Sequence, residues 1–370
     1  AESGPPLAGP LELAAYAAVL RAAGDEHWDR PLREVLATAG ESATAWPLAA
    51  DLIAGLRARL RSDLAAEAAD AWARRAADAA AYGWEMVFRT EALWAHLHTD
   101  GTTERTAAIG TALARHDLPE TAGPLLASAR ALAVADRGDL ARARALAGAD
   151  SATCLGRWLG AELALLDGDE TSAQALAGGL LVDLADDDPA LPLTVLTAAW
   201  AGTPTTDRAH LPSPLQLTLL ALETGAWAAA AGAWNGALRR ERVRALLAEA
   251  GGDTGGTAPT GAAVGILQDA ERIATEGGLA VLAGRARREL RRRGALVDQP
   301  ERPAPGADEH GLSGREREVI DLVAQGQSSR RIAERLGLTS HTVESYVKSA
   351  MQKLGARTRT EATVLARRTR

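Results

Sequence analysis

Residues 337–356 read GLTSHTVESYVKSAMQKLGA and contain both lysines of the 370-residue chain, Lys348 and Lys353. Successive residues of a helix are rotated by about 100°, so that residues three or four apart share a face. One face of this segment is then apolar and consists of Val343, Val347, Ala350 and Leu354. The opposite face is polar and consists of His341, Glu344, Ser345, Lys348 and Gln352. The pattern predicts a helix over 339–354 with one buried and one exposed side.

Three shorter helices are expected around this segment. Ser313 and Glu316 have the spacing of a capping box and predict a helix that ends before Gly326. Ser328 is placed to cap a second helix, SRRIAERL, and a fourth helix is expected from about residue 360 to 368. A short turn at residues 337–339, with Thr339 as the next cap, joins the second helix to the helix over 339–354. Two helices joined in this way predict a helix-turn-helix.

A helix-turn-helix places the first half of its second helix in the major groove of DNA. The residues expected to read base edges are His341, Glu344, Ser345 and Lys348. The residues expected to contact phosphates are Ser328, Arg330, Arg331, Thr342, Tyr346, Lys353, Arg357 and Arg359. The alternative is that the polar stripe is only a solvated face.

The distribution of charge favours the DNA interpretation. The whole chain has a formal net charge of −7, but residues 312–370 hold twelve Lys and Arg against six Asp and Glu. That segment therefore carries +6, and residues 1–311 carry −13. An acidic body with a small basic unit indicates that the basic unit meets a polyanion.

Residues 1–297 predict helix after helix, because apolar residues recur at three- and four-residue spacing. Three segments read helix, glycine turn, helix, centred on Gly138, Gly168 and Gly225. This weak repeat favours a tetratricopeptide-like helical solenoid, with a less regular helical domain as the alternative. Residues 250–265 are expected to form a loop, and residues 298–311 to form a Pro- and Gly-rich linker.

The segment LSGREREVIDLVAQGQSSRRIAERLGLTSHTVESYVKSAMQKLGARTRTEA, residues 312–362, resembles the LuxR-type (GerE-like) helix-turn-helix family. The resemblance implies a four-helix domain over 312–370 that binds DNA through its third helix. It also implies dimerisation through the fourth helix, with Ala362 and Leu365 as the expected contacts. Glu344 stands where the family usually has Lys, and Tyr346 where it usually has His. An anion at 344 should weaken general DNA affinity.

Residues 237–297 are similar to the end of the helical-repeat region of large ATP-binding regulators of the maltose-regulator class. Those regulators carry a P-loop, and no GxxxxGK[ST] occurs here. Two interpretations remain: the C-terminal part of such a protein, favoured by the start at Ala1 instead of Met, or a shorter relative that senses without nucleotide. Receiver and acyl-homoserine-lactone-binding domains are excluded as the body, because both need strands.

Other classes of site find little support in the sequence. A single cysteine, Cys154, excludes a disulfide framework and a Cys-based zinc site, and no G-x-S-x-G elbow occurs. His96 and His98 are two apart on a helix and are expected to be surface or hydrogen-bonded residues, not metal ligands. The nine tryptophans are expected mainly to pack, although some could line a pocket. The arginines of the helix over 284–296 are expected mainly to be solvated.

The sequence therefore predicts an all-α cytoplasmic bacterial transcription regulator, not an enzyme, without cofactor, metal or membrane span. Its expected partners are double-stranded DNA, a second copy on DNA, a small-molecule or protein effector on residues 1–297 and, for an activator, RNA polymerase. The alternative is a helical-repeat scaffold for a protein partner with a weak or vestigial DNA-binding unit.

Overall fold

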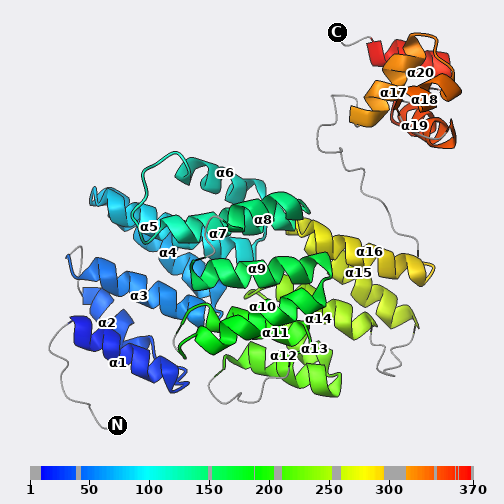
Figure 1. Ribbon diagram of the computed structural model, residues 1–370. Helices are drawn as coiled ribbons and strands as arrows, with labels where there is room; N and C mark the ends of the chain where they lie inside the picture. Colours follow the sequence, from blue (N-terminus) through cyan, green and yellow to red (C-terminus); the bar gives the residue numbers. More distant parts are fainter. Residues whose placement is uncertain are drawn as a thin grey trace. The chain divides into compact units, whose positions relative to one another are not determined.

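The structure is all-α over the described residues. The computed structural model describes residues 10–38, 43–148, 152–186, 188–203, 211–251, 260–295, 314–336, 340–354, 356 and 358–367, which form helices and turns but no strand. Contacts divide the chain into two units, Ala1–Leu296 and Val297–Arg370 (Figure 1). The predicted linker over 298–311 lies outside the described residues. The all-α prediction is confirmed.

Helices of the first unit pack mainly on the next helix along the chain. The first eight are α1 (Pro10–Ala22), α2 (Arg30–Thr38), α3 (Ala45–Ala58), α4 (Ser62–Asp78), α5 (Tyr82–Thr99), α6 (Glu104–Leu113), α7 (Gly123–Asp136) and α8 (Leu140–Gly148). The next eight are α9 (Cys154–Asp167), α10 (Glu170–Asp183), α11 (Leu191–Trp200), α12 (Ser213–Thr224), α13 (Trp227–Ala233), α14 (Arg239–Gly251), α15 (Thr260–Glu276) and α16 (Ala280–Arg292). This arrangement of consecutive helix pairs is consistent with a helical-repeat body.

The three predicted glycine turns are confirmed. Gly138 lies between α7 and α8, Gly168 between α9 and α10, and Gly225 between α12 and α13, with φ of 93°, 88° and 75°. A positive φ costs glycine little because it has no Cβ, so these positions can reverse the chain directly after a helix. Each turn lets a helix fold back on its predecessor.

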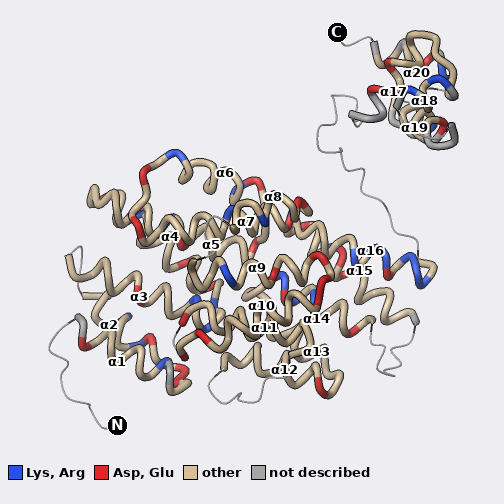
Figure 2. Tube along the Cα trace, viewed as in Figure 1, with Lys and Arg blue, Asp and Glu red and all other residues tan. Residues whose placement is uncertain are grey.

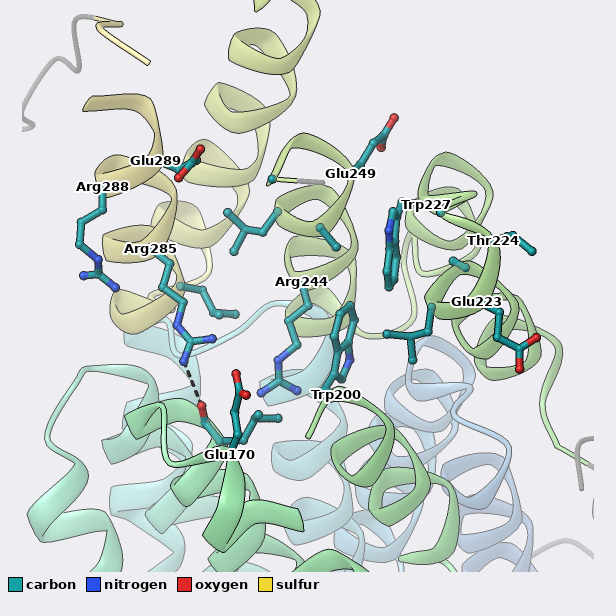
Figure 3. Close-up of a pocket in the computed structure, with 18 of the residues that line it drawn as sticks. Glu170, Trp200, Glu223, Thr224, Trp227, Arg244, Glu249, Arg285, Arg288 and Glu289 are labelled. Atoms are coloured by element: carbon teal, nitrogen blue, oxygen red, sulfur yellow. Dashed lines mark hydrogen bonds between the residues drawn. The ribbon is translucent and has the colours of Figure 1, made fainter. Parts of the chain in front are cut away.

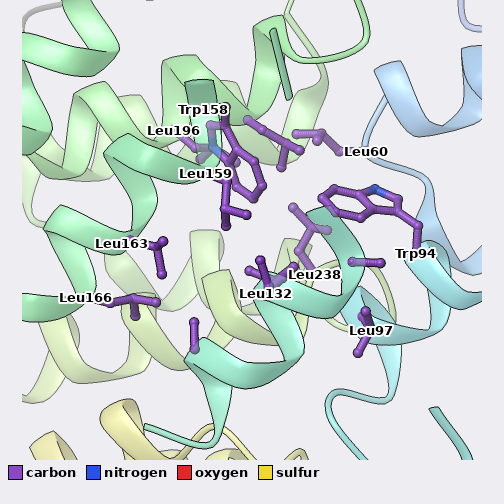
Figure 4. Packing of buried hydrophobic residues seen from close by; sticks show 14 of the residues in the cluster. Leu60, Trp94, Leu97, Leu132, Trp158, Leu159, Leu163, Leu166, Leu196 and Leu238 are labelled. Carbon is purple, nitrogen blue, oxygen red and sulfur yellow. The ribbon is translucent and has the colours of Figure 1, made fainter. Parts of the chain in front are cut away.

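Two large apolar clusters hold the first unit together. One surrounds the buried indoles of Trp94, Trp158 and Trp234, and its central part is drawn in Figure 4. The other, built from α1 to α5, contains Trp46 and Trp72, whose rings meet edge to face at 5.6 Å. The prediction that most tryptophans pack is therefore confirmed. Full burial of a large side chain contributes about 1.5–3 kcal/mol each.

A chain of buried ion pairs crosses the same unit and was not foreseen from the sequence. Arg240 of α14 donates to Asp136 of α7 at 2.5 Å. Arg244, one turn further along α14, donates to Glu162 of α9 at 2.6 Å and to Glu241 at 2.7 Å. None of these side chains is more than 6% exposed. The ion network, defined as these five residues, joins three helices that are distant in sequence.

The two histidines of α5 are both buried, and of the two environments expected for them His96 has the hydrogen-bonded one. His96 contacts Asp70 and Asp100 through its two ring nitrogens, each at 3.0 Å. The ring of His98 meets Trp94 at 4.8 Å, and its Nε2 has no hydrogen-bond partner. Burial, with Arg240 and Arg57 nearby, lowers the pKa of His98 to about 3, so the ring is neutral. Within the described residues no cluster of His, Cys, Asp or Glu has the makings of a metal site.

Two other expectations need correction. The loop predicted over 250–265 is shorter, because α14 continues to Gly251 and α15 begins at Thr260, where Ala263 and Leu267 are fully buried. Residues 252–259 lie outside the description. The arginines expected to be solvated over 284–296 are only partly so: Arg287 of α16 pairs with Glu271, and Arg293, directly after α16, donates to the carbonyl of Ala250. Among the helices that can be described, none has the length and apolar character to cross a membrane.

Candidate nucleic-acid interface

The described residues of the second unit form four short helices at the predicted places. They are α17 (Gly314–Ala324), α18 (Ser329–Leu336), α19 (Ser340–Lys353) and α20 (Arg359–Arg367). Gly326, with φ of 79°, follows the end of α17 as expected. The hydroxyl of Ser328 accepts from the backbone N–H of Arg331 at 3.4 Å, a long bond in the position of an N-cap. The other expected caps, Ser313 and Thr339, lie outside the described residues.

The apolar side of α19 is buried as its sequence predicts. Val343 and Ala350 are fully buried and Val347 nearly so, while Leu354 is partly buried against the cluster that contains Ala362 of α20. These side chains meet two apolar clusters that α17, α18 and α20 complete. The other fully or nearly buried members are Val319, Ile320, Leu322, Val323, Ile332, Ala333, Ala362 and Ala366. One side of α19 is therefore packed against α17, α18 and α20.

The opposite side of α19 faces solvent. Glu344 and Lys348 are both exposed, and a spacing of four places them one turn apart on the same face. His341 and Ser345 belong to the same helix, but their side chains lie outside the description. Tyr346 is half-buried and packs against the cluster around Val319 and Ile332. The Tyr346 ring therefore packs against the core and is also a candidate phosphate contact.

The start of α18 offers further polar groups. Ser328 and Arg331 are exposed there. The side chains of Arg330, Thr342 and Lys353, and the whole of Arg357, lie outside the description. Figure 2 marks the Lys and Arg of the second unit in blue where they are described. The net charge of +6 over residues 312–370 provides the long-range attraction to a polyanion that such a face requires.

The two residues expected in dimerisation differ in accessibility. Ala362 is fully buried against Ile320 and Ala350 inside the unit. Leu365 is half-buried and keeps some exposed surface. Of the pair, Leu365 alone has side-chain surface to offer a second copy.

Residues 310–366 match the family model described as bacterial regulatory proteins, luxR family. Spore germination protein GerE of Bacillus subtilis is 42% identical over 53 residues, which are 14% of this chain and 72% of GerE. This chain belongs to the LuxR family of bacterial regulatory proteins. The family match begins close to the predicted start of the second unit at residue 312.

Longer relatives share only a part of their length with this LuxR-family chain. The HTH-type transcriptional activator RamA of Corynebacterium glutamicum is 42% identical over 96 residues, 25% of this chain and 34% of RamA. The DNA-binding transcriptional activator DevR/DosR of Mycobacterium tuberculosis is 39% identical over 56 residues, 15% of this chain and 26% of the relative. The chain thus spans about a third of RamA. No solved structure matches the chain.

The LuxR-family unit contains one contact that sequence periodicity does not reveal. Arg359, at the start of α20, donates to the carbonyl of Gln327 at 2.8 Å and to the hydroxyl of Ser329 at 3.2 Å. It thereby ties the beginning of α18 to α20. The partners are about thirty residues apart, so no local pattern marks them. Arg359 was expected to contact phosphate, and its observed bonds give it a positioning role within the unit.

Proposed function

We propose that residues 312–370 bind double-stranded DNA and that α19 lies in the major groove. The observation that carries the proposal is the division of α19 into a buried side and an exposed side that presents Glu344 and Lys348. A lysine can donate to guanine O6 and N7, and a glutamate can accept from cytosine N4. His341 and Ser345 are proposed as the other base contacts. Membership of the LuxR family supports this assignment.

The proposed phosphate contacts surround α19 and fix its orientation on the duplex. Arg331 and Ser328, both exposed at the start of α18, carry this part most directly. The remaining proposed contacts are Arg330, Thr342, Tyr346, Lys353, Arg357 and Arg359. We propose that two copies bind a two-fold related site, with Leu365 at their contact. Such pairing sets the spacing of the half-sites.

The chain is proposed to regulate transcription from cytoplasmic DNA, with the helical body as the part that receives a signal. Its effector is a small molecule or a protein. RamA and DevR/DosR are both activators by name, which favours activation and contact with RNA polymerase. The body is proposed to be related to the helical-repeat region of maltose-regulator-class proteins. Its consecutive helix pairs support that relation.

The proposal is tested by selecting bound sequences from random duplexes with the full chain at physiological salt. A two-fold motif is expected. Lys348→Ala should then lose about 1–3 kcal/mol of discrimination at one base pair of each half-site. Arg331→Ala should weaken all sequences alike and reduce the salt slope by about 1.

Arg291→Ala is the matched control, because Arg291 is an exposed arginine of α16 in the other unit. It removes the same charge from the chain but from outside the DNA-binding unit, so its affinity and salt slope should equal those of the unaltered chain. Selection of no motif, or equal behaviour of the Lys348→Ala and Arg291→Ala variants, would refute the docking of α19.

A scaffold function is the second candidate. The observation in its favour is Glu344, an exposed anion on the face that would meet DNA. In this case residues 1–297 bind a protein partner and the second unit contributes little. The variant Glu344→Lys, which reverses the charge on this face, separates the two functions.

A further inference from the structure

The helical body has a groove whose size suits a small molecule. Its volume is about 990 Å³, and its walls come from α9 to α14 and α16, all within the first unit (Figure 3). Ligand sites in proteins typically measure about 300–1,000 Å³ and combine an apolar lining with a few polar groups. The apolar part of its lining includes Leu165, Leu247 and Leu282.

One wall is aromatic. Trp200 and Trp227 stack with ring centroids 5.2 Å apart and planes inclined by 14°. Both indoles are half-buried, unlike Trp94, Trp158 and Trp234 in the core. The Nε1–H of Trp200 donates to Glu241 of the ion network at 2.6 Å, which fixes this ring in place. The partly exposed indole of Trp227 provides a flat apolar surface on which a ring can stack.

The facing wall carries arginines of α16. Arg285 donates to the carbonyls of Leu165 and Leu166 at 2.9 and 3.2 Å, which are neutral acceptors. Burial, and then the neighbouring charges of Arg244 and Arg288, lower the pKa of Arg285. Arg288 is exposed and has no hydrogen bond or ion pair within the described part of the chain. Two guanidinium groups without a carboxylate partner therefore lie side by side.

The acidic residues of the groove do not cancel this charge locally. Glu289 is already shared by Arg292 and Arg293. Glu249 and Glu223 lie towards the tryptophan side in Figure 3, away from Arg285. Glu162 and Glu170 oppose the lowering of the pKa of Arg285, but neither forms an ion pair with it in the described part of the chain. The groove thus has a separated positive end, although it contains four arginines and four glutamates in all.

We propose that this groove binds a small organic anion, with its carboxylate or phosphate at Arg285 and Arg288 and a planar ring against Trp227. A guanidinium donates two parallel hydrogen bonds to either oxyanion, and arginine binds both geometries well. The ring requirement follows from the stacked tryptophan wall. The binding site is inferred from the groove alone. The further step, that its ligand is the effector of the chain, rests on the proposed function.

The site is tested on the full chain by ligand-observed NMR titration with three probes. They are 2-aminobenzoate, phenyl phosphate and 2-aminobenzamide, which keeps the ring and removes the charge. Saturable binding of at least one anion is expected, about tenfold or more tighter than that of the amide. The preferred anion tells a carboxylate ligand from a phosphate ligand.

Variants then locate the binding. Arg288→Ala should lower the affinity for the anion that binds about tenfold and leave the affinity for the amide unchanged. Trp227→Leu should lower the affinity for all three probes. Arg291→Ala removes an exposed arginine three residues along the same helix and outside the groove lining, and should change nothing. Circular dichroism confirms that each variant is folded.

The proposal is overturned if no probe binds saturably up to about 10 mM, or if Arg288→Ala and Arg291→Ala behave alike. If neither 2-aminobenzoate nor phenyl phosphate binds more tightly than 2-aminobenzamide, the proposal is also overturned, because the charge then has no role. No DNA is present in the titration, so a failure of DNA binding and a failure of this site remain distinguishable.

Discussion

The ion network makes a quantitative prediction about the stability of the helical body. Arg240→Met keeps most of the side-chain volume and removes the guanidinium that pairs with Asp136 at 2.5 Å. The side chains of Arg240 and Asp136 are only 6% and 2% exposed. After the change, the Asp136 carboxylate keeps the hydroxyl of Thr102, at 3.1 Å, and loses its cation.

The expected loss is large because the remaining charge cannot reach water. Removing one partner of a buried pair typically costs about 3–5 kcal/mol. For a unit of this size, each kcal/mol lowers Tm by about 2 °C, so a fall of about 6–10 °C is expected at pH 7. Arg144→Met is the control, since Arg144 and Asp167 are also 2.5 Å apart but 48% and 50% exposed. Its cost should stay below about 1 kcal/mol.

Thermal unfolding followed by tryptophan fluorescence reports on this unit alone, because all nine tryptophans lie between residues 28 and 234. The loss should also depend on pH. Burial raises the pKa of Asp136 above its ordinary 3.8, and without Arg240 it rises further. Between the unfolded and folded pKa values the native state binds more protons, so the variant's stability falls as pH rises. The loss of stability of Arg240→Met relative to the unaltered chain should therefore become smaller from pH 7 towards pH 4.

Adding Asp136→Asn to Arg240→Met removes the stranded charge and should recover part of the lost Tm, since replacing both partners costs less than removing one. The reasoning is refuted if Arg240→Met costs no more than Arg144→Met. It is equally refuted if the deficit is constant with pH and the double variant is no more stable than the single one.

Two further predictions concern the second unit. Glu344→Lys should raise the affinity for nonspecific DNA and steepen the salt slope by about 1, as measured by fluorescence anisotropy. A fall in affinity would show that Glu344 makes a required base contact, and no change would favour the scaffold function. Arg359→Ala should free the start of α18 at a cost of about 1–3 kcal/mol and speed amide exchange at Ile332 and Ala333 relative to Arg291→Ala; unchanged exchange would show that Arg359 does not position this helix.

The helices of the second unit could be predicted because their signals are local. In α19 the apolar residues recur at helical spacing, so the buried Val343 and exposed Lys348 follow from their positions in the sequence. Gly326 marks a chain reversal for the same reason as Gly138, Gly168 and Gly225. In each case one or two neighbouring residues carry the information.

Turns that contain no glycine could not be predicted from such local signals. The alanine-rich stretch over 64–97 has no Gly or Pro between α4 and α5, yet the chain reverses at Ala80 with φ of 54°. Leu60 has φ of 57° between α3 and α4 and is 2% exposed. Packing of the adjoining helices outweighs the cost of about 1–2 kcal/mol for a left-handed residue with a side chain. Gly261 is the second residue of α15 despite the low helix propensity of glycine, and Ala263, two residues further along, is fully buried.

The ion network escaped prediction because its partners are far apart in sequence. Asp136 and Arg240 are separated by 104 residues, and Glu162 and Arg244 by 82. Buried and solvated arginines look identical in a sequence of this composition. Only the fold distinguishes Arg244, which is buried, from Arg288, which is free to meet a ligand.

The groove and the ion network are connected through Glu241. Glu241 holds both Arg244 and the indole of Trp200, so the aromatic wall is anchored to the charges that join α9 to α14. Arg285 instead caps the last turn of α9 through two carbonyls, an arrangement that suits a cation at a helix C-terminus. An anion in the groove would compete for that guanidinium. Binding would then weaken the cap on α9 while the aromatic wall stays in place, which makes the end of α9 the part of the body that we expect to respond first.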